Sequence, residues 1–188
     1  MIETIEFKGE EFLKLQSEGN AAQYAIPFAK KVLKNCKTIF DVGCNRLSWA
    51  YPLAIPVDLT FNDSHLSLTD LAGNPYDFFH KNYSALNLPH DIIPDAIFSS
   101  HFLEHFRGSW VDVLDYWNSV LPRGGIVFLY LPHYSQKYWR SWNNRKHIHN
   151  LSAEILEDYF VESGNWGQIF VTRGFDLNNS FYAIATKK

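Results

Sequence analysis

The stretch Lys37-Thr-Ile-Phe-Asp-Val-Gly-Cys-Asn45 decides the fold predicted for this chain. Its apolar and β-branched residues are typical of a buried strand, and Gly43 ends that strand in a turn where the backbone can closely approach a ligand. A second apolar run follows at 54–59 and carries the carboxylate of Asp58. In nucleotide-binding α/β proteins an acidic residue after the second strand bonds a ribose diol. The stretch therefore predicts a parallel sheet that binds an adenosine-containing ligand.

Length and composition favour a single globular domain. The chain has 188 residues, of which 46% are hydrophobic and 20% charged, so it can bury one substantial core. We expect one domain over 1–188, with an N-terminal helical segment over 1–36 and a Rossmann-like core over 37–188. The formal net charge of -3 provides no broad basic face, so bulk nucleic acid is not an expected partner.

The sequence also predicts where the protein works. The first ten residues lack the basic start and apolar run of a signal peptide, and no later stretch is long and apolar enough for a membrane span. Cys36 and Cys44 are the two cysteines, which fits a reducing compartment and gives no disulfide framework. We predict a cytoplasmic protein without a membrane partner.

Hydrophobic periodicity predicts the order of the remaining elements. A helix is expected over 20–32, where Pro27 must interrupt or kink it or separate two short helices. Alternation of strands and helices then predicts parallel pairing. The other expected elements are strands at 54–59, 95–100, 125–131, 168–173 and 180–186, a short strand near 78–83, and helices at 109–120 and 152–161 capped by Ser109 and Ser152.

Three motifs occur in the order that is typical of one enzyme family. They are Phe40-Asp-Val-Gly-Cys44, Asp95-Ala-Ile-Phe-Ser-Ser-His-Phe-Leu-Glu-His105 and Leu121-Pro-Arg-Gly-Gly125. On these motifs the chain, over roughly 38–187, resembles the small class I, Rossmann-like S-adenosylmethionine-dependent methyltransferases. The resemblance implies an α/β fold with a mostly parallel central sheet, helices on both faces and an antiparallel C-terminal strand. It also implies S-adenosylmethionine as the cofactor.

The resemblance assigns residues to that cofactor. The first turn approaches its methionine part, the acid after the second strand takes the ribose hydroxyls, and the residue after the fourth strand faces the reacting centre. These roles carry over to Gly43, Asp58 and His101. Ser84 stands where the family often has an acid for the adenine amino group. The expected cofactor-binding residues are Gly19, Asn20, Asp41, Gly43, Cys44, Asn45, Asp58, Ser84, Ser99, Ser100 and His101.

Two of these positions have alternative interpretations. Gly19 and Asn20 precede a helix whose free N–H groups could receive the cofactor carboxylate, although Asn20 could equally be a helix cap. Asn45 stands where the family has a second glycine, and it must either adopt a left-handed backbone conformation or move the loop away from the ligand. The altered turn supports a second hypothesis, a catalytically silent Rossmann-like binding module. In a further hypothesis the chain is the cofactor subunit of a complex with a protein partner.

Acceptor candidates follow the fourth and fifth strands. Methyl transfer needs a nucleophile held in line with the methyl group, and a base where that nucleophile carries a proton. His105, one helical turn after His101, is expected to share its face, while Glu104 points elsewhere. The predicted catalytic residues around the acceptor are His101, His133, Tyr134 and His147.

The segment 133–149 combines aromatic rings with positive charge and follows the fifth strand. These features favour a small-molecule acceptor, sugar-like or nucleotide-like, that carries phosphate or carboxylate. The alternative is a solvated basic loop pinned by Trp139 and Trp142. The charged residues are Lys137, Arg140, Arg145 and Lys146.

Five histidines could converge at one end of the sheet and bind zinc or iron. No paired Cys motif and no clear ligating carboxylate accompanies them, so we predict no metal site. A metal-dependent enzyme remains an alternative hypothesis. The histidines are His101, His105, His133, His147 and His149.

Overall fold

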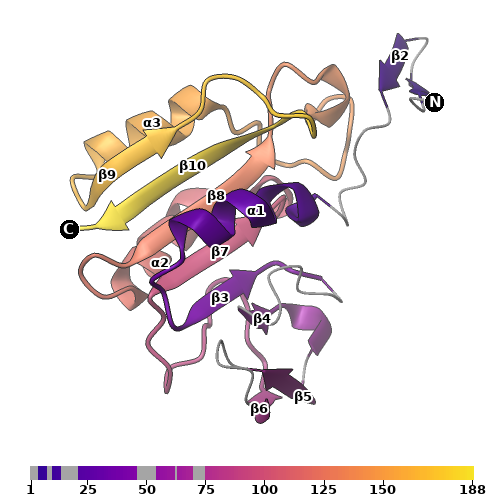
Figure 1. The fold of residues 1–188 in the computed structure, drawn as a ribbon. Coiled ribbons are helices and arrows are strands. Elements are labelled where there is room, and N and C mark those ends of the chain that lie inside the picture. Colours follow the sequence, from indigo (N-terminus) through magenta and orange to yellow (C-terminus); the bar gives the residue numbers. More distant parts are fainter. Residues whose placement is uncertain (1–3, 8–9, 14–20, 46–53, 62, 70–74) are drawn as a thin grey trace.

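The computed structural model describes residues 4–7, 10–13, 21–45, 54–61, 63–69 and 75–188. Within them a six-stranded sheet forms the centre of the chain (Figure 1). Its strands, in order across the sheet, are β4 (Ile55–Val57), β3 (Ile39–Val42), β7 (Ala96–Ser100), β8 (Ile126–Pro132), β10 (Ser180–Lys187) and β9 (Trp166–Val171).

The sheet is parallel over its first four strands and antiparallel at its C-terminal side. Phe40 of β3 pairs with Ile55 of β4 and with Ile97 of β7, both in parallel register. β7 is also parallel to β8, whereas β10 runs antiparallel to β8 and to β9. The carboxyl ends of the parallel strands therefore lie at one edge, which is where open α/β sheets bind ligands.

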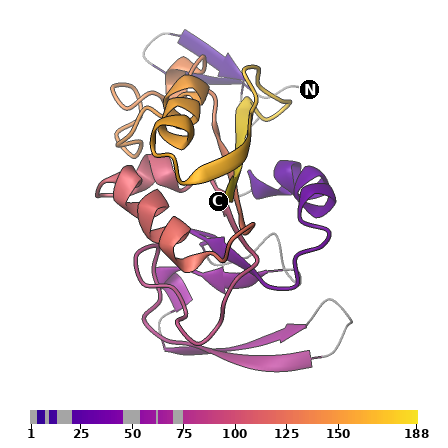
Figure 2. The same cartoon turned by 90° about the vertical axis from the view of Figure 1, so that its left-hand side faces the viewer.

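Helices cover both faces of this sheet. Figure 2 shows α2 (Trp110–Val120) and α3 (Ala153–Glu162) on one side and α1 (Ala22–Val32) on the other. The predicted caps are present, since Ser109 accepts a hydrogen bond from the Asp112 amide and Ser152 accepts one from the Ile155 amide. This arrangement confirms the predicted fold class.

Each face has its own core. Trp117 of α2 is fully buried among residues of the parallel strands, and its indole Nε1 donates to the Ala85 carbonyl at 2.8 Å. On the opposite face Ala25 and Ala29 bring α1 close to the sheet, and Phe28 packs edge-on against Tyr182. Full burial of one large apolar side chain contributes about 1.5–3 kcal/mol, so these contacts fix the helices to the sheet.

α1 is a single helix that contains Pro27. The proline is exposed, so its ring faces away from the sheet and the apolar face of α1 is uninterrupted. Of the alternatives for this segment, two short helices are therefore excluded. The positions expected to precede the helix, Gly19 and Asn20, lie outside the described residues.

Two hairpins differ from the expectations. β5 (Ser64–Thr69) and β6 (Pro75–His80) pair with each other and not with the central sheet, so the short strand expected near 78–83 ends at His80. β1 (Thr4–Phe7) and β2 (Glu10–Leu13) form a hairpin in the segment expected to be helical. Alternation of polar and apolar residues in Thr4-Ile-Glu-Phe7 has the period of a strand. No helix in the described part of the chain is long and apolar enough to cross a membrane.

Candidate functional site

A cavity of about 450 Å³ lies at the carboxyl edge of the parallel strands. Residues after β3, after β7 and in the long segment after β8 line it, and α1 contributes Ala22 from its first turn. The lining residues are Ala22, Asp41, Gly43, Cys44, Asn45, Ser100, His101, Phe102, His105, Arg107, Arg145, Lys146 and Ile148. The sheet therefore gathers most of the residues predicted for the methionine end of the cofactor.

The turn after β3 takes the left-handed conformation at two residues. Gly43 has φ +77° and Asn45 has φ +58°. The Gly43 amide donates to the Val57 carbonyl at 2.9 Å, and the Asn45 amide donates to the Asp58 carboxylate at 2.8 Å. Asparagine tolerates this conformation better than most residues, so Asn45 replaces the second glycine without moving the turn away from the neighbouring strand.

Asp58 joins this turn to a second cavity. Its carboxylate accepts hydrogen bonds from the amides of Asn45 and Thr60, at 2.8 and 2.9 Å. With Ser84 it lines a cavity of about 130 Å³. Gly43 and Phe102 line both cavities, so the two spaces adjoin. The remaining residues of the smaller cavity are Val57, Leu59, Ala85 and Phe106.

His101 directly follows β7 and has a strained backbone conformation. Its φ is +49°, and its amide donates to the Tyr130 carbonyl at 2.8 Å. The side chain is 1% exposed, and its Nε2 lies 2.8 Å from the Ser180 hydroxyl. A left-handed histidine costs roughly 1 kcal/mol and persists where surrounding contacts over-determine it.

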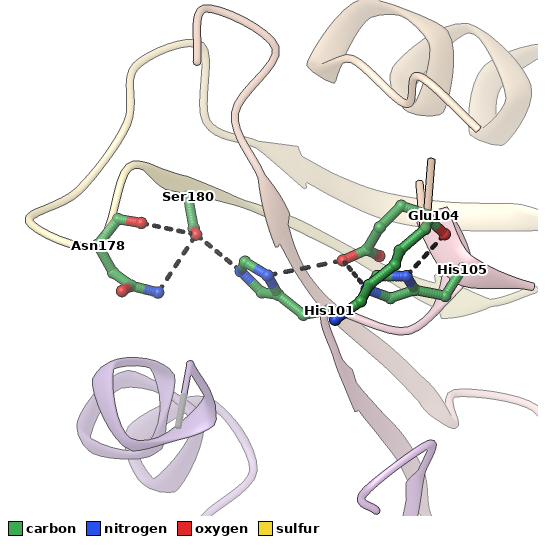
Figure 3. Close-up of polar contacts among 6 residues, drawn as sticks. His101, Glu104, His105, Asn178 and Ser180 are labelled. Atoms are coloured by element: carbon green, nitrogen blue, oxygen red, sulfur yellow. Dashed lines mark hydrogen bonds and ion pairs between the residues drawn. The ribbon is translucent and has the colours of Figure 1, made fainter. Parts of the chain in front are cut away.

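Glu104 lies between two histidines (Figure 3). It is 1% exposed, and its Oε1 is 3.6 Å from Nδ1 of His101 and 3.8 Å from Nε2 of His105. The expectation that Glu104 points away from these rings is therefore wrong. The expected spacing was that of an α-helix, whereas His101 is left-handed and Leu103–His105 is a 3₁₀ helix.

Three of the predicted catalytic residues lie apart from the large cavity. His133, Tyr134 and His147 line a separate small space together with Glu104 and Trp139, while His101 lines the large cavity. His133 is held in the loop, because its Nε2 donates to the Arg173 carbonyl at 3.1 Å and its Nδ1 accepts from the Ser135 amide. The structure thus divides the four residues expected around one acceptor.

The two serines at the end of β7 also have different surroundings. Ser100 lines the large cavity, whereas Ser99 is buried and donates its hydroxyl to the Val42 carbonyl at 2.9 Å. Ser99 therefore ties β7 to β3 and is not a cavity residue. Alternation of side chains along a strand explains the difference.

Positive charge gathers around the large cavity. Arg107, Arg145 and Lys146 line it, against the single acidic side chain of Asp41 among the lining residues. Arg140 instead lies over the Tyr134 ring at 4.4 Å, away from this cavity. Neither Arg107 nor Phe102 was singled out as a site residue in the sequence, although Phe102 lies within the motif that contains His101 and Arg107 follows that motif by two residues.

Cys44 lines the cavity as a neutral thiol. Burial raises the pKa of its thiol far above the ordinary value, and the carboxylates of Asp41 and Asp58 raise it further. Because the thiolate is the reactive form of cysteine, Cys44 is no nucleophile at neutral pH. It acts as a small side chain in the turn.

The pH dependence of stability is expected to report on His80, which lies behind Asp58. Burial lowers the pKa of His80 below its ordinary value of 6.5, and Asp58 and Asp63 only partly oppose this effect. Its neutral Nε2 accepts the Asp58 amide hydrogen at 3.4 Å. As pH falls, His80 binds a proton at a higher pH in the unfolded chain than in the folded chain. The His80 contribution is therefore complete above pH 6.5 and is lost between there and the lowered pKa.

Urea unfolding between pH 8 and 5 measures this loss, which for one proton has a slope of up to about 1.4 kcal/mol per pH unit. The variant His80→Phe removes the titrating group, so the slope within this window should be smaller than in the parent chain. Equal slopes in the two proteins would contradict the assignment.

Comparison with solved structures identifies similar folds. A S-adenosylmethionine-dependent methyltransferase from Archaeoglobus fulgidus matches 90% of this chain and 94% of its own, with a TM-score of 0.62 and 15% identity. Another from Thermotoga maritima matches 91% of each chain, with a TM-score of 0.62 and 17% identity. The N-methyltransferase NodS from Bradyrhizobium japonicum, in complex with S-adenosyl-l-homocysteine, matches 88% of this chain and 86% of its own, with a TM-score of 0.58 and 9% identity.

These similarities lie in the arrangement of the backbone. No family model matches the sequence, and comparison with curated proteins finds no match. The structural matches nevertheless extend over about nine-tenths of this chain. The chain has the Rossmann-like fold of the S-adenosylmethionine-dependent methyltransferases, as its three motifs predict.

Proposed function

We propose that this chain binds S-adenosylmethionine across the two adjoining cavities and transfers its methyl group to a small anionic acceptor. The observation that carries the proposal is the shared wall of Gly43 and Phe102 between the cavities. A ligand with an adenosine part and a charged amino-acid part needs two connected spaces of different chemistry. The NodS complex with S-adenosyl-l-homocysteine shows that a protein of this fold takes such a ligand.

The smaller cavity suits the adenosine part. Leu59, Ala85 and Phe106 provide apolar walls for the flat base, and Ser84 provides a hydroxyl near it. The Asp58 carboxylate has two oxygens that each accept one backbone hydrogen bond, and a carboxylate oxygen can accept a second. Both ribose hydroxyls can therefore donate to it.

The larger cavity suits the methionine part and the acceptor. Ala22 places the first turn of α1 at the cavity wall, where the free amides of a helix N-terminus favour a carboxylate. Asp41, which is 2% exposed and lines the same cavity, is an acceptor for the ammonium group. Together these two features provide a partner for each charge of the amino acid.

The basic residues of the large cavity favour an acceptor that carries phosphate or carboxylate. Arg107, Arg145 and Lys146 are exposed cavity residues, and guanidinium groups bind such anions through paired hydrogen bonds. In the transfer, the acceptor atom forms a bond to the methyl carbon while the sulfur keeps the electron pair of the broken bond. Where the acceptor carries a proton, His101, whose imidazole lines the cavity, can take it.

Calorimetric titration with S-adenosylmethionine and S-adenosylhomocysteine tests the cofactor part of the proposal. Saturable binding of both ligands is the expected result, and a screen of sugar phosphates and nucleotides for methylation then tests the acceptor class. Absence of binding at millimolar ligand would favour the cofactor-free alternatives, a silent module or a subunit that requires its protein partner. Binding without any methylated product would favour the silent module.

A further inference from the structure

We propose that Glu104, His105 and His147 form a binding site for a divalent transition metal ion next to the acceptor cavity. One ligand atom from each of these residues lies within 4.8 Å of the other two. The three come from the segment after β7 and from the long segment after β8, which are 42 residues apart in sequence between His105 and His147. Their convergence is therefore a property of the fold.

The hydrogen bond of His105 to a backbone carbonyl determines which of its ring nitrogens can bind a metal. Its Nδ1 lies 2.9 Å from the Lys146 carbonyl, and a carbonyl only accepts, so Nδ1 carries the proton. The lone pair of the neutral ring is then on Nε2, 3.8 Å from Oε1 of Glu104 (Figure 3). A ring N–H bonded to a backbone carbonyl is the usual partner that orients a metal-bound histidine.

His101 has the same polarity on the other side of the carboxylate. The Ser180 hydroxyl donates to the Asn178 carbonyl at 3.1 Å, so the contact of 2.8 Å between Ser180 and His101 has Nε2–H as its donor (Figure 3). The lone pair of the neutral ring is then on Nδ1, 3.6 Å from Oε1 of Glu104. Oε1 of Glu104 thus lies within 4 Å of a ring nitrogen of each neighbouring histidine, an arrangement of oxygen and nitrogen atoms that is typical of ligands around a cation.

Backbone hydrogen bonds hold the segment that follows His147 beside the backbone of Glu104. The amides of Ile148 and His149 both donate to the Glu104 carbonyl, at 2.6 and 3.1 Å. The His147 ring stacks on Trp139 with a centroid distance of 5.1 Å and meets the His105 ring edge-on at 4.6 Å. The ring is therefore oriented by packing on two sides, as a metal ligand requires.

Two imidazoles and one carboxylate are ligands that suit Zn²⁺ and similar transition metals. Zinc bonds such ligands at about 2.0–2.2 Å, so any two of them end about 4.2 Å apart or less, and the side chains close on the ion by small rotations. Three protein ligands leave a fourth position open. Because His105 also lines the large cavity, the site adjoins that cavity, and an atom of the acceptor can take the fourth position. This role in acceptor binding, unlike the site itself, rests on the proposed function.

Zinc binding by protein produced without a histidine tag tests the site. After equilibration with Zn²⁺ and dialysis against metal-free buffer, elemental analysis should find about one zinc per chain, and zinc should raise the thermal unfolding midpoint. Glu104→Gln and the less buried His105→Asn should each lower zinc affinity at least tenfold, with circular dichroism confirming that each variant folds. Co²⁺ should give visible absorption bands in the parent chain and not in these variants.

His90→Asn is the matched control, because His90 is an exposed histidine that contacts Asn87 on the surface. It should bind zinc as the parent chain does. The proposal would be overturned if the parent chain retained no zinc, or if both site variants bound zinc as tightly as the parent chain does. In that event protonated imidazoles would balance the charge of the Glu104 carboxylate. Zinc retained in a chain that fails to bind S-adenosylmethionine would overturn the proposed function and leave the metal site in place.

Discussion

Asp58→Ala is expected to weaken S-adenosylmethionine binding by at least about 100-fold while the chain remains folded, because two charge-assisted hydrogen bonds to the ribose are lost at about 1.5 kcal/mol or more each. The same change releases the amides of Asn45 and Thr60, which the carboxylate holds at 2.8 and 2.9 Å. The turn after β3 therefore loses an anchor along with the ligand contact. Calorimetric titration gives the affinity, and circular dichroism gives the fold.

Two further variants separate charge from general surface effects. Asp58→Asn keeps an oxygen that can accept one backbone hydrogen bond and should weaken binding to an intermediate degree. Asp77→Ala removes an exposed carboxylate of β6 that accepts a hydrogen bond from Ser67 at 3.1 Å, and it should leave affinity unchanged. Retention of parent affinity in Asp58→Ala would remove the ribose contact from the proposal.

The strands at the centre of the sheet could be predicted because most of their residues are apolar. Residues 96–99 and 127–131 are buried, and strands covered on both faces show as largely apolar runs bounded by turn residues. The caps at Ser109 and Ser152 were equally predictable, because the N-cap hydrogen bond depends on one residue and its local backbone. Local chemistry was sufficient for these elements.

The edges of the fold were harder to predict for a physical reason. The pairing of β5 with β6 depends on partners and on turns that few residues specify, so the sequence indicated one short strand where a separate hairpin forms. In β6, Phe78 and His80 are buried, and Phe79 between them is exposed. That pattern fits a hairpin with one covered face better than a strand of the central sheet.

The residues of the candidate site also differ in how well their positions could be predicted. Gly43 and Asp58 could be placed because they follow strand ends, and Ser84 could be placed from its offset in the family resemblance; all three line the cavities. Glu104 could not be placed, because its direction depends on the left-handed backbone of His101, and no spacing rule anticipates a strained histidine. The position of His133 could not be predicted either, because a long loop without periodicity folds by contacts between residues that are distant in sequence.

Gly43→Ala is expected to destabilise the chain by about 2–4 kcal/mol and to abolish cofactor binding, through the combination of backbone strain and steric overlap. Gly43 has φ +77°, and a Cβ there would lie 2.4 Å from the ring of Phe102. That ring lines both cavities, so its displacement changes the wall that the adenosine and methionine parts share. Urea unfolding gives the loss of stability, and calorimetric titration gives the affinity.

Gly124→Ala isolates the steric part of this effect. Gly124 has φ +81°, close to that of Gly43, but a Cβ there meets no atom within 4 Å. Its cost should therefore be the conformational one alone, about 1 kcal/mol, with cofactor affinity unchanged. Equal losses of stability in the two variants would show that Phe102 yields freely to a methyl group. In that event the close approach of Gly43 to Phe102 would not define the boundary between the two cavities.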